Sequence, residues 1–575
     1  MTVLVGCRSG DHDAEPDLGT GMDAGDDLGA PDESRPAAKC SSQSGRICKG
    51  LDIYHCEGGE IAEFIESCPA DGACSLGRCT SVECANIEGR DSLRGCLFYS
   101  VQVDNIDEDD ATRMVLLVSN ASGLPANVAV EARGVSDEMW EEVMPAVTVG
   151  SPAGSRLTVN RPVQEVGKVA SAALRITSDR PIIAAQLINE NRDHDSKSSG
   201  ATVLLPAQSL RSRYMALTYP ALPSASVAAT PGGRGGAGMI VIVGTETGGT
   251  VIVKPTAAMD VGDGNTVEVG GEYRAGLNDG DVLQLFSADP NGDLTGTHIE
   301  ATSAVAVFSG NVFTSYGQDP SGWNGADLAF EQMPPYENWG EEYVGAFHSP
   351  QRGCDSYWGG TGGMWQVLAA TDGTVVTLDP SPGTVFWMVD GQPFDGKQFT
   401  LKRGESRRFL ALPQGTANPD FIARSNHPHR ILLAQWLDCE PALAWGIDTR
   451  FDFGKLALVL PPGFDNEVLV ARRVGQTGSF VDGKELRSAD FGPPFGGASD
   501  GTDAKSKIQI ARVTGLGADS KDLGPCAVQE DRCQHVIGDG SLGLSWRGMD
   551  VTCSFMLTFP PASLCGSDTT VCGTE

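Results

Sequence analysis

One pattern recurs along this chain at a fixed spacing, and it constrains the fold more than any other feature of the sequence. An isoleucine that opens an apolar strand occurs at Ile176, Ile299 and Ile422, each separated from the next by 123 residues. The turn 277–281 likewise matches the turn 401–405 at a separation of 124 residues. Landmarks that keep one period indicate an internal repeat. A shorter fourth copy begins near Val468.

The clearest copy of the repeat, residues 239–311, is typical of antiparallel β-structure. Apolar runs such as 239–243 and 250–253 are joined by a turn at Gly248-Gly249, as in β-hairpins. About seven or eight short strands per repeat predict one antiparallel, Ig-like β-sandwich for each repeat. An alternative splits each repeat into two four-stranded blades of a seven- or eight-bladed propeller. The best short helix candidate is 136–144.

A chain of 575 residues is too long for one core,. The repeat and the composition together predict seven segments. They are a remnant of a lipoprotein signal (1–7), an acidic linker (8–38), a Cys-rich module (39–96), β repeat 1 (97–195), β repeat 2 (196–318), β repeat 3 (319–450), and β repeat 4 with a Cys-containing tail (451–575).

Eight cysteines are concentrated in the Cys-rich module. So short a segment needs cross-links to be stable, which predicts disulfides. The alternative, a zinc site, lacks any Cys-x-x-Cys pair. Cys553 is the cysteine expected to stay unpaired. The cysteines expected in disulfides, without an assigned pairing, are Cys40, Cys48, Cys56, Cys68, Cys74, Cys79, Cys84, Cys96, Cys354, Cys439, Cys526, Cys533, Cys565 and Cys572.

The net charge limits the possible partners. The formal charge of −33 repels phosphate backbones and anionic membrane surfaces, so nucleic acid is excluded as a partner,. The sequence contains no apolar run long enough for a membrane-spanning helix,. A membrane connection is therefore expected only through an N-terminal lipid anchor.

The lipid anchor is predicted at Cys7. The run Leu4-Val5-Gly6-Cys7 resembles the lipobox of bacterial lipoproteins, although only three residues precede it,. Arg8 after the cysteine favours the outer membrane in such lipoproteins. The predicted location is therefore the outer membrane or cell surface, or otherwise the secreted fraction.

No catalytic residue is predicted. The chain has no Gly-x-Ser-x-Gly elbow, no His-Glu-x-x-His motif and no Walker glycine loop,. His427 and His429 flank a proline and are interpreted as part of a solvated turn. No cofactor is expected, with calcium as the one possible exception.

The calcium candidates are carboxylates and amides spaced along two turns. Oxygen ligands at alternate positions suit Ca²⁺, but neither turn is a complete EF-hand loop. Asx turns explain the same residues without an ion. The candidates are Asp260, Asp263, Asp289, Asn291 and Asp293.

Aromatic residues provide the candidates for ligand binding. Tyr357, Trp358 and Trp365 lie on a Gly-rich stretch next to Cys354. Exposed aromatics of this kind bind glycans or proteins. The alternative is that both tryptophans pack into a sandwich core.

Three motifs in a fixed order resemble a known family. They are Phe-Ser-Gly-Asn (308–311), Glu-Gln-Met-Pro-Pro (331–335) and Trp-Gly-x-x-Tyr (339–343). The IgGFc-binding protein N-terminal domain family carries the same motifs, and the resemblance spans about 90–560. The Cys-rich module is similar to modules that precede this domain in bacterial lipoproteins. Relatives read Cys-Asp-His-Leu where this chain reads Ala326-Asp327-Leu328-Ala329, so no cystine or metal role is expected there.

The resemblance implies a binding protein but leaves the ligand open. The family is named for a mucus protein whose N-terminal region binds antibody Fc, and a shared fold does not transfer a ligand. The first hypothesis is therefore a non-enzymatic, lipid-anchored surface protein that binds a protein or glycan in adhesion. The alternatives are a secreted carbohydrate-active hydrolase or lyase on a β scaffold, and a purely structural envelope protein.

Overall fold

The structure is a computed structural model of the chain. It describes residues 44–57, 60–87, 92–105, 113–120, 122–134, 139–151, 153–160, 166–188, 199–220, 236–289, 291–314, 327–348, 364–389, 394, 397–415, 418–437, 442–449, 456–459, 466–475, 480–481, 484–496, 507–516, 534–538, 543–549 and 554–559. Among these residues no helix is long and apolar enough to cross a membrane.

Strand pairing groups the described elements into a small module and four larger units. The Cys-rich module contains β1 (Ser44–Lys49), β2 (Asp52–Glu57), β3 (Glu60–Ser67), β4 (Ala73–Ser75), β5 (Arg78–Thr80) and α1 (Val82–Asn86). Unit 1 contains β6 (Gly95–Ser100), β7 (Arg113–Asn120), β8 (Ala126–Arg133), β9 (Trp140–Glu142), β10 (Val147–Val149), β11 (Ala153–Asn160), β13 (Leu174–Ile188) and β14 (Gly200–Leu204). Between β11 and β13 in the chain lies β12 (Gly167–Val169), which pairs with β21 (Val282–Ser287) of unit 2.

Units 2 and 3 have the same plan. Unit 2 contains η1 (Ala207–Ser209), β15 (Arg211–Met215), β16 (Gly238–Gly244), β17 (Gly249–Lys254), β18 (Met259–Gly262), β19 (Asn265–Val267), β20 (Tyr273–Leu277), β21 (Val282–Ser287), β22 (His298–Thr314) and β23 (Asp327–Gln332). Unit 3 contains η3 (Tyr336–Asn338), β24 (Glu342–Gly345), β25 (Met364–Ala369), β26 (Thr374–Pro380), β27 (Thr384–Met388), β28 (Gln398–Leu401), β29 (Ser406–Pro413), β30 (Phe421–Ser425), β31 (Ile431–Trp436), β32 (Leu443–Trp445) and β33 (Ile447–Asp448).

Unit 4 completes the set. It contains β34 (Leu456–Val459), β35 (Asn466–Arg473), β36 (Phe480–Val481), β37 (Lys484–Glu485), η4 (Ser488–Asp490), β38 (Ile508–Leu516), β39 (Gln534–Gly538), β40 (Gly543–Met549) and β41 (Ser554–Phe559). The strands of the described residues pair in antiparallel fashion, so the all-β prediction is confirmed.

A long central strand joins the two sheets of each of the first two units. The first half of β13 pairs with β6 and β8, and its second half pairs with β7 and β14. In unit 2, β22 divides its pairing in the same way, between β15 and β17 and then β16 and β23. Unit 3 uses two strands, β30 and β31, separated by the turn around Pro428. In units 1 and 2 one strand therefore takes part in both sheets, whereas in unit 3 each sheet has its own strand.

The strand register reproduces the sequence period. Ile176 is opposite Val130 in unit 1, and Ile299 is opposite Val253 in unit 2. Both members of the second pair lie 123 residues beyond those of the first. Pairing also extends unit 1 to β14, beyond the predicted boundary at 195, because β14 pairs with β13.

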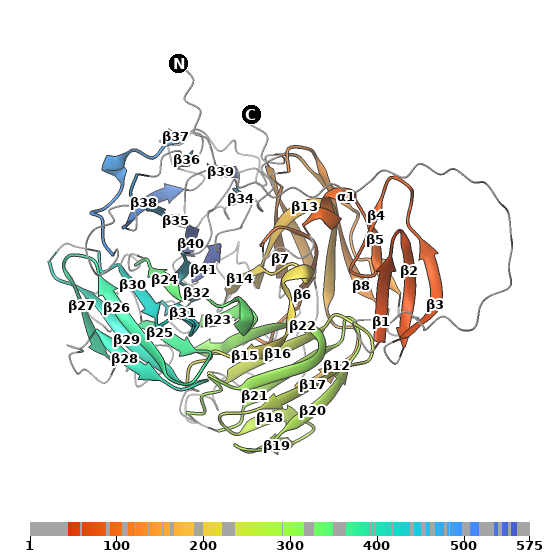
Figure 1. The fold of residues 1–575 in the computed structure, drawn as a ribbon, viewed down its shortest axis with the longest axis horizontal. Helices are drawn as coiled ribbons and strands as arrows, with labels where there is room; N and C mark the ends of the chain where they lie inside the picture. The colour runs from red at the N-terminus through yellow and green to blue at the C-terminus, as the bar shows by residue number, and fades with distance from the viewer. Residues whose placement is uncertain are drawn as a thin grey trace, which may run out of the picture.

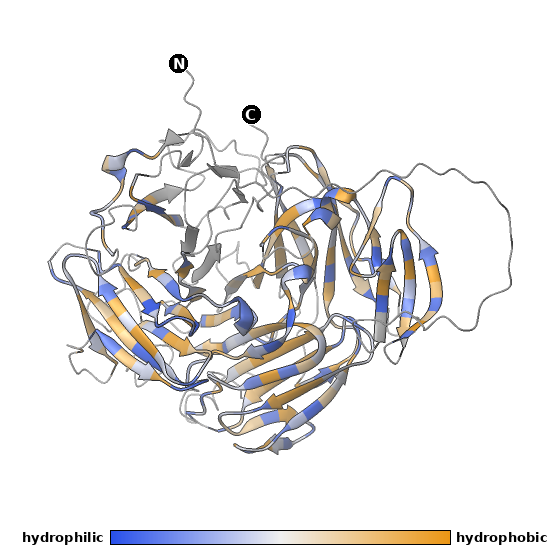
Figure 2. Ribbon diagram, in the orientation of Figure 1, coloured by the Kyte–Doolittle hydropathy of each residue, from blue (hydrophilic) through white to orange (hydrophobic). Residues whose placement is uncertain are grey.

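The continuous apolar run of β16 is explained by cover on both faces. Ile240 and Ile242 pack in a core shared with unit 3, whereas Val241 and Val243 pack in a core shared with unit 1. A strand that is buried on both faces needs no polar alternation. Sheets therefore pack on each other within units and between units. Figure 2 shows hydrophobic residues distributed along the strands, with hydrophilic residues between them.

The units close into a ring. Val115 of β7 packs with Val470 of β35, which joins unit 1 to unit 4. Val344 of β24 packs with Leu469 of β35, which joins unit 3 to unit 4. The strands β14, β23, β32 and β41 complete the circuit, because β14 and β32 each contact both β23 and β41. Figure 1 shows the four units arranged around one centre.

The arrangement combines the two predicted architectures. Both sheets of unit 1 share one core, with Leu116 of β7 packed among the same residues as Val130 of β8, as in a sandwich. Ring closure, in contrast, is the feature of the propeller alternative. Packing between units makes this chain one assembly rather than a string of independent sandwiches.

The predicted helix at 136–144 is wrong at its centre. Trp140–Glu142 is a strand, β9, which pairs with β8. Tertiary contacts decide the conformation here, because the Trp140 indole is held by unit 2. Within the described residues α1 is the one α-helix.

Candidate binding surface and buried polar centres

The structure corrects the prediction that Trp365 is a ligand-binding aromatic. Its side chain is 2% exposed and lies in the core shared by units 2 and 3. Its ring meets the edge of Phe421 at a centroid distance of 4.9 Å. For Trp365, hydrophobic burial of a large ring outweighs display at the surface. Tyr357 and Trp358 lie outside the described residues.

The calcium candidate Asp293 has protein partners at both carboxylate oxygens. Its Oδ1 accepts hydrogen bonds from the Thr218 hydroxyl (3.0 Å) and the Thr295 amide (2.9 Å). Its Oδ2 forms an ion pair with Arg408 of unit 3 at 2.8 Å. A guanidinium supplies the positive charge at this carboxylate, which therefore joins two units.

The other calcium candidates lie in turns, except Asp260, which lies in β18 beside a turn. The Asp260 carboxylate accepts a hydrogen bond from the Gly262 amide at 2.9 Å, as in an Asx turn,. Asp263 and Asn291 have positive φ values of 54° and 65°. The Asp289 carbonyl accepts from the Gly292 amide at 2.9 Å. Within the described residues no group of three or more His, Cys, Asp or Glu side chains is placed to hold a metal ion.

The Phe-Ser-Gly-Asn motif is a clamp on a neighbouring segment. The Ser309 hydroxyl bonds to both the amide and the carbonyl of Leu217, each at 3.0 Å. The Asn311 side chain does the same at Tyr219, at 2.7 and 2.8 Å. Gly310 is required between them because a Cβ there would lie 1.9 Å from the Ala329 carbonyl oxygen. The motif therefore has an architectural role.

Unit 1 carries the corresponding clamp. The Gln186 side chain accepts from the Val101 amide at 3.3 Å and donates to the Val101 carbonyl at 3.1 Å. Gln186 lies 123 residues before Ser309. Gln186 and Ser309 therefore bind neighbouring backbone at the same position of the repeat, although the residue type differs.

The Glu-Gln motif places a carboxyl group in the interior. Glu331 is buried and accepts a hydrogen bond from the Thr202 hydroxyl of β14. Burial raises the pKa of Glu331 well above its usual range,. The adjacent Gln332 accepts from the Leu205 amide at 2.7 Å. These contacts join β14 to β23 near the ring centre.

A second polar centre joins units 1 and 2. The Asp279 carboxylate accepts from the Tyr99 hydroxyl and the Trp140 indole N–H, both at 2.9 Å. The Arg175 guanidinium lies 4.4 Å from the Trp140 ring centroid and pairs with Glu131 at 2.8 Å. Burial raises the pKa of Asp279, and burial together with the Asp279 charge raises the pKa of Tyr99.

A third centre joins units 3 and 4. His348 and Glu467 are 0% and 2% exposed, with Nδ1 and Oε2 2.9 Å apart. Arg512 pairs with Asp420, which also accepts from the Phe347 amide at 2.8 Å. Burial raises the pKa of Asp420, and the Arg512 charge opposes that rise. Each of these three polar centres therefore lies at a contact between units rather than in an open site.

Disulfides hold the Cys-rich module together and attach it to the ring. Within the module, Cys48 bonds to Cys74 and Cys68 bonds to Cys79. Cys56 is disulfide-bonded as well. Cys84 on α1 bonds to Cys96 on β6 of unit 1. The predicted Cys7, Cys40, Cys354, Cys439, Cys526, Cys533, Cys553, Cys565 and Cys572 lie outside the described residues.

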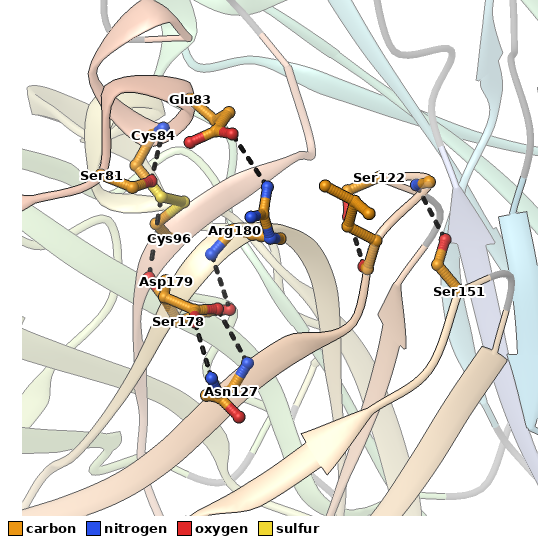
Figure 3. Close-up of polar contacts among 12 residues, drawn as sticks. Ser81, Glu83, Cys84, Cys96, Ser122, Asn127, Ser151, Ser178, Asp179 and Arg180 are labelled. Carbon is orange, nitrogen blue, oxygen red and sulfur yellow. Dashed lines mark hydrogen bonds and ion pairs between the residues drawn. A yellow bond between two sulfur atoms is a disulfide. The ribbon is translucent and has the colours of Figure 1, made fainter. Parts of the chain in front are cut away.

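Polar contacts support the same attachment, and Figure 3 shows those of Glu83 and Ser81 near the Cys84–Cys96 bond. Arg180 of β13 pairs with Glu83 of α1 at 2.8 Å. Ser81 caps α1 by accepting from the Cys84 amide at 3.2 Å. The Arg78 guanidinium donates to the Cys96 carbonyl at 2.9 Å. Burial and the nearby Arg175 charge lower the pKa of Arg78 to about 10.

The module also presents an aromatic surface that sequence reasoning missed. Phe64 of β3 is 52% exposed and meets Tyr54 of β2 edge to face at 5.7 Å. The sequence signal was Glu-Ile-Ala-Glu-Phe-Ile-Glu (60–66), where an aromatic stands among carboxylates.

Comparisons with known proteins differ in what they support. A search of curated proteins finds no match. Among solved structures, trypsin-activated alpha-2-macroglobulin from Escherichia coli is 10% identical with a TM-score of 0.14, over 90% of this chain and 48% of that one. Methylamine-reacted alpha-2-macroglobulin from Salmonella is 10% identical with a TM-score of 0.11, over 91% and 44%. These scores support no argument about fold, and this chain spans less than half the length of either.

A family model gives the informative match. The model described as IgGFc binding protein matches residues 200–435. That segment begins at β14, includes unit 2 and ends within β31 of unit 3. It contains the clamp residues Ser309 and Asn311 and the buried Glu331. Residues 200–435 are therefore similar to the IgGFc binding protein family.

Proposed function

We propose that this chain is a non-enzymatic surface protein that binds a protein or glycan ligand in adhesion. The match of residues 200–435 to a family of binding proteins, which is not an enzyme family, is the observation that supports this function most. The motif residues of that segment clamp backbone or lie buried between strands. The ring then serves as a scaffold that displays other surfaces.

The proposal includes an N-terminal lipid anchor at Cys7 and a location at the outer membrane or cell surface. The lipobox-like Leu4-Val5-Gly6-Cys7 and the acidic segment after it support an anchored protein with a tether,. The disulfides of the Cys-rich module support an oxidising compartment,. Mass spectrometry of the N-terminus of the native protein tests the anchor, and an unmodified Cys7 would contradict it.

The binding test uses the purified whole chain. Immobilised immunoglobulin, mucin and glycan panels are probed by surface plasmon resonance, with an unrelated protein of similar negative charge as the control. Saturable binding that the control lacks is expected for at least one panel. Uniformly negative panels would contradict a binding function. Turnover of a polysaccharide, abolished by changing one carboxylate, would instead support the hydrolase or lyase alternative.

A further inference from the structure

The turn 402–405 of unit 3 lies directly against the start of β22 in unit 2. A Cβ at Gly296 would be 2.2 Å from the carbonyl oxygen of Gly404, so the two segments touch backbone to backbone. Beside this contact, the Arg403 guanidinium reaches the His298 imidazole, with Nη2 and Nδ1 3.2 Å apart. A single side-chain pair therefore joins units 2 and 3 at this turn.

The donor at Nδ1 determines which protonation state of His298 this contact allows. A guanidinium can only donate, so Nδ1 must accept the hydrogen bond and cannot carry a proton. An imidazolium has protons on both ring nitrogens and offers no acceptor. Protonation of His298 therefore replaces the hydrogen bond from Arg403 by repulsion between two cations.

The sheet around His298 contributes further charges. Lys254 of β17 is the register partner of His298, and Glu300 lies two residues along β22, so both are on the same face of the sheet as the imidazole. Lys254 disfavours an imidazolium, whereas Glu300 favours one. Glu272 of the neighbouring strand end pairs with Arg274 and, at 3.7 Å, with Lys254.

Unit 3 and β15 place the remaining groups near Arg403. The Arg403 guanidinium lies 5.7 Å from the Tyr336 ring centroid, and that of Arg213 lies 4.8 Å from the same centroid. Glu337 pairs with Arg213 at 2.6 Å, so that charge is compensated. Asp372 accepts from the backbone amide of Arg403 at 2.9 Å. The other charged residues of the turn are Lys402 and Glu405.

These surroundings keep His298 neutral in the folded chain. Burial lowers the pKa of His298, the charges of Arg403 and Lys254 lower it further, and Glu300 opposes them. The unfolded chain therefore takes up this proton at a higher pH than the folded chain does. The stabilisation is complete above the ordinary pKa of 6.5 and is lost as pH falls below it,.

We propose that His298 and Arg403 form an acid-sensitive latch between units 2 and 3. In neutral solution their hydrogen bond holds the turn 402–405 against β22. When the imidazole gains a proton, the turn moves away and the contact between the units loosens at this point. The apolar core that the units share and the Asp293–Arg408 ion pair remain, so the loosening is local.

Hydrogen–deuterium exchange of the whole chain, read by mass spectrometry, tests the latch. Exchange at about pH 5 and about pH 7.5, on either side of the ordinary histidine pKa, is compared after correction for the intrinsic effect of pH on exchange. The amides of the turn include that of Gly404, which donates to the Ala369 carbonyl at 2.9 Å. Their protection is expected to fall by up to about tenfold at the acidic pH, the factor that corresponds to one pKa unit.

Two variants separate the latch from a general effect of acid. His298→Gln keeps a side-chain acceptor for Arg403 but cannot gain a proton, so the turn is expected to stay protected at both pH values. Arg403→Gln removes the latch altogether, so the turn is expected to be less protected at neutral pH and to change little on acidification. Circular dichroism at each pH confirms that both variants are folded.

His427→Gln is the matched control, because it removes another histidine of unit 3. His427 is 83% exposed and pairs with Glu341 at 2.9 Å, away from the turn 402–405. The control is expected to lose protection at the turn as the unaltered chain does.

Three outcomes would show the latch to be wrong. They are full protection of the turn at pH 5 in the unaltered chain, an acid-induced loss in His298→Gln equal to that of the unaltered chain, and disappearance of the loss in His427→Gln. A direct measurement gives a fourth test. Nuclear magnetic resonance of the chain with carbon-13-labelled histidine, assigned with His298→Gln, is expected to show a pKa of His298 below the ordinary value, and a higher one would contradict the latch.

Discussion

At the residue scale, the family motifs act through hydrogen bonds to backbone. Ser309 and Asn311 each satisfy an amide and a carbonyl of the segment 217–219, which has no strand partner of its own at those atoms. Buried backbone groups without partners destabilise a fold. These side chains therefore supply the hydrogen bonds that a neighbouring strand would otherwise form. Gln186 performs the same task in unit 1 with a longer side chain.

Asn311→Ala is therefore expected to lower the free energy of unfolding by about 2 to 3 kcal/mol, because three backbone groups lose a buried partner. The midpoint of urea denaturation measures the change. Asn265→Ala, at an exposed position at the start of β19, is the control and is expected to change stability by less than about 0.5 kcal/mol,. Equal effects of the two substitutions would show that the clamp contributes nothing.

Glu331 gives a second prediction at this scale, a dependence of stability on pH. Its pKa is raised in the folded state, so the folded chain holds this proton more tightly than the unfolded chain. The stabilisation is present below the unfolded pKa and is lost as pH rises towards the folded pKa. Glu331→Gln removes the titrating group and is expected to stabilise the chain by about 1 to 2 kcal/mol at pH 7.

Urea midpoints of this variant and the unaltered chain between pH 4 and 8 measure the difference. The two curves are expected to converge at the acidic end and to separate as pH rises, whereas Glu268→Gln follows the unaltered chain. Parallel curves for Glu331→Gln and the unaltered chain would rule out titration of Glu331 as the cause.

At the scale of elements, α1 is the link between the module and the ring. Its five residues carry Cys84, which bonds to β6, and Glu83, which pairs with β13. A helix this short has little stability of its own, so tertiary contacts hold it. The module's internal disulfides, Cys48–Cys74 and Cys68–Cys79, do not depend on this link.

Replacing both Cys84 and Cys96 by Ala is expected to release the module without unfolding the ring. The closed loop has a sequence separation of 12 residues, and cross-links over loops of about this size contribute about 3 kcal/mol. Limited proteolysis followed by mass spectrometry should show faster cleavage between positions 84 and 96. Val82→Ser, an exposed change on α1, is the control. Unchanged cleavage would show that the polar contacts alone fix the module.

At the scale of the whole molecule, ring closure makes the units interdependent. Unit 4 covers apolar residues of unit 1, such as Val115 and Leu117, and of unit 3, such as Val344 and Ile422. Independent sandwiches joined in tandem would not bury these faces against a distant unit. Ring closure therefore buries apolar surface of unit 1 and of unit 3 against unit 4.

Deleting residues 450–575 is expected to expose these faces, with increased binding of an environment-sensitive dye such as ANS and loss of solubility. Deleting residues 1–38 is the matched control and should leave dye binding unchanged. A soluble truncated chain with unchanged dye binding would show that the first three units are stable without ring closure.

Local patterns in the sequence determined much of this protein. Apolar runs, Gly-rich turns and the 123-residue period predict an all-β repeat protein, because strand formation and hairpin turns depend on near neighbours. Clustered cysteines predict the disulfides of the module for a similar reason. The resemblance carried by the motifs at 308–311 and 331–335 identified the family that the match over residues 200–435 supports.

Contacts between distant residues decided the rest. The burial of Trp365, the pairing of Asp293 with Arg408 across 115 residues, and the strand at Trp140 all depend on which units meet. The period is compatible with separate sandwiches and with a closed ring, because both use the same strands. Only the packing of β35 against units 1 and 3 selects the ring. That packing joins residues as distant in the chain as Val115 and Val470, so no local sequence pattern predicts it.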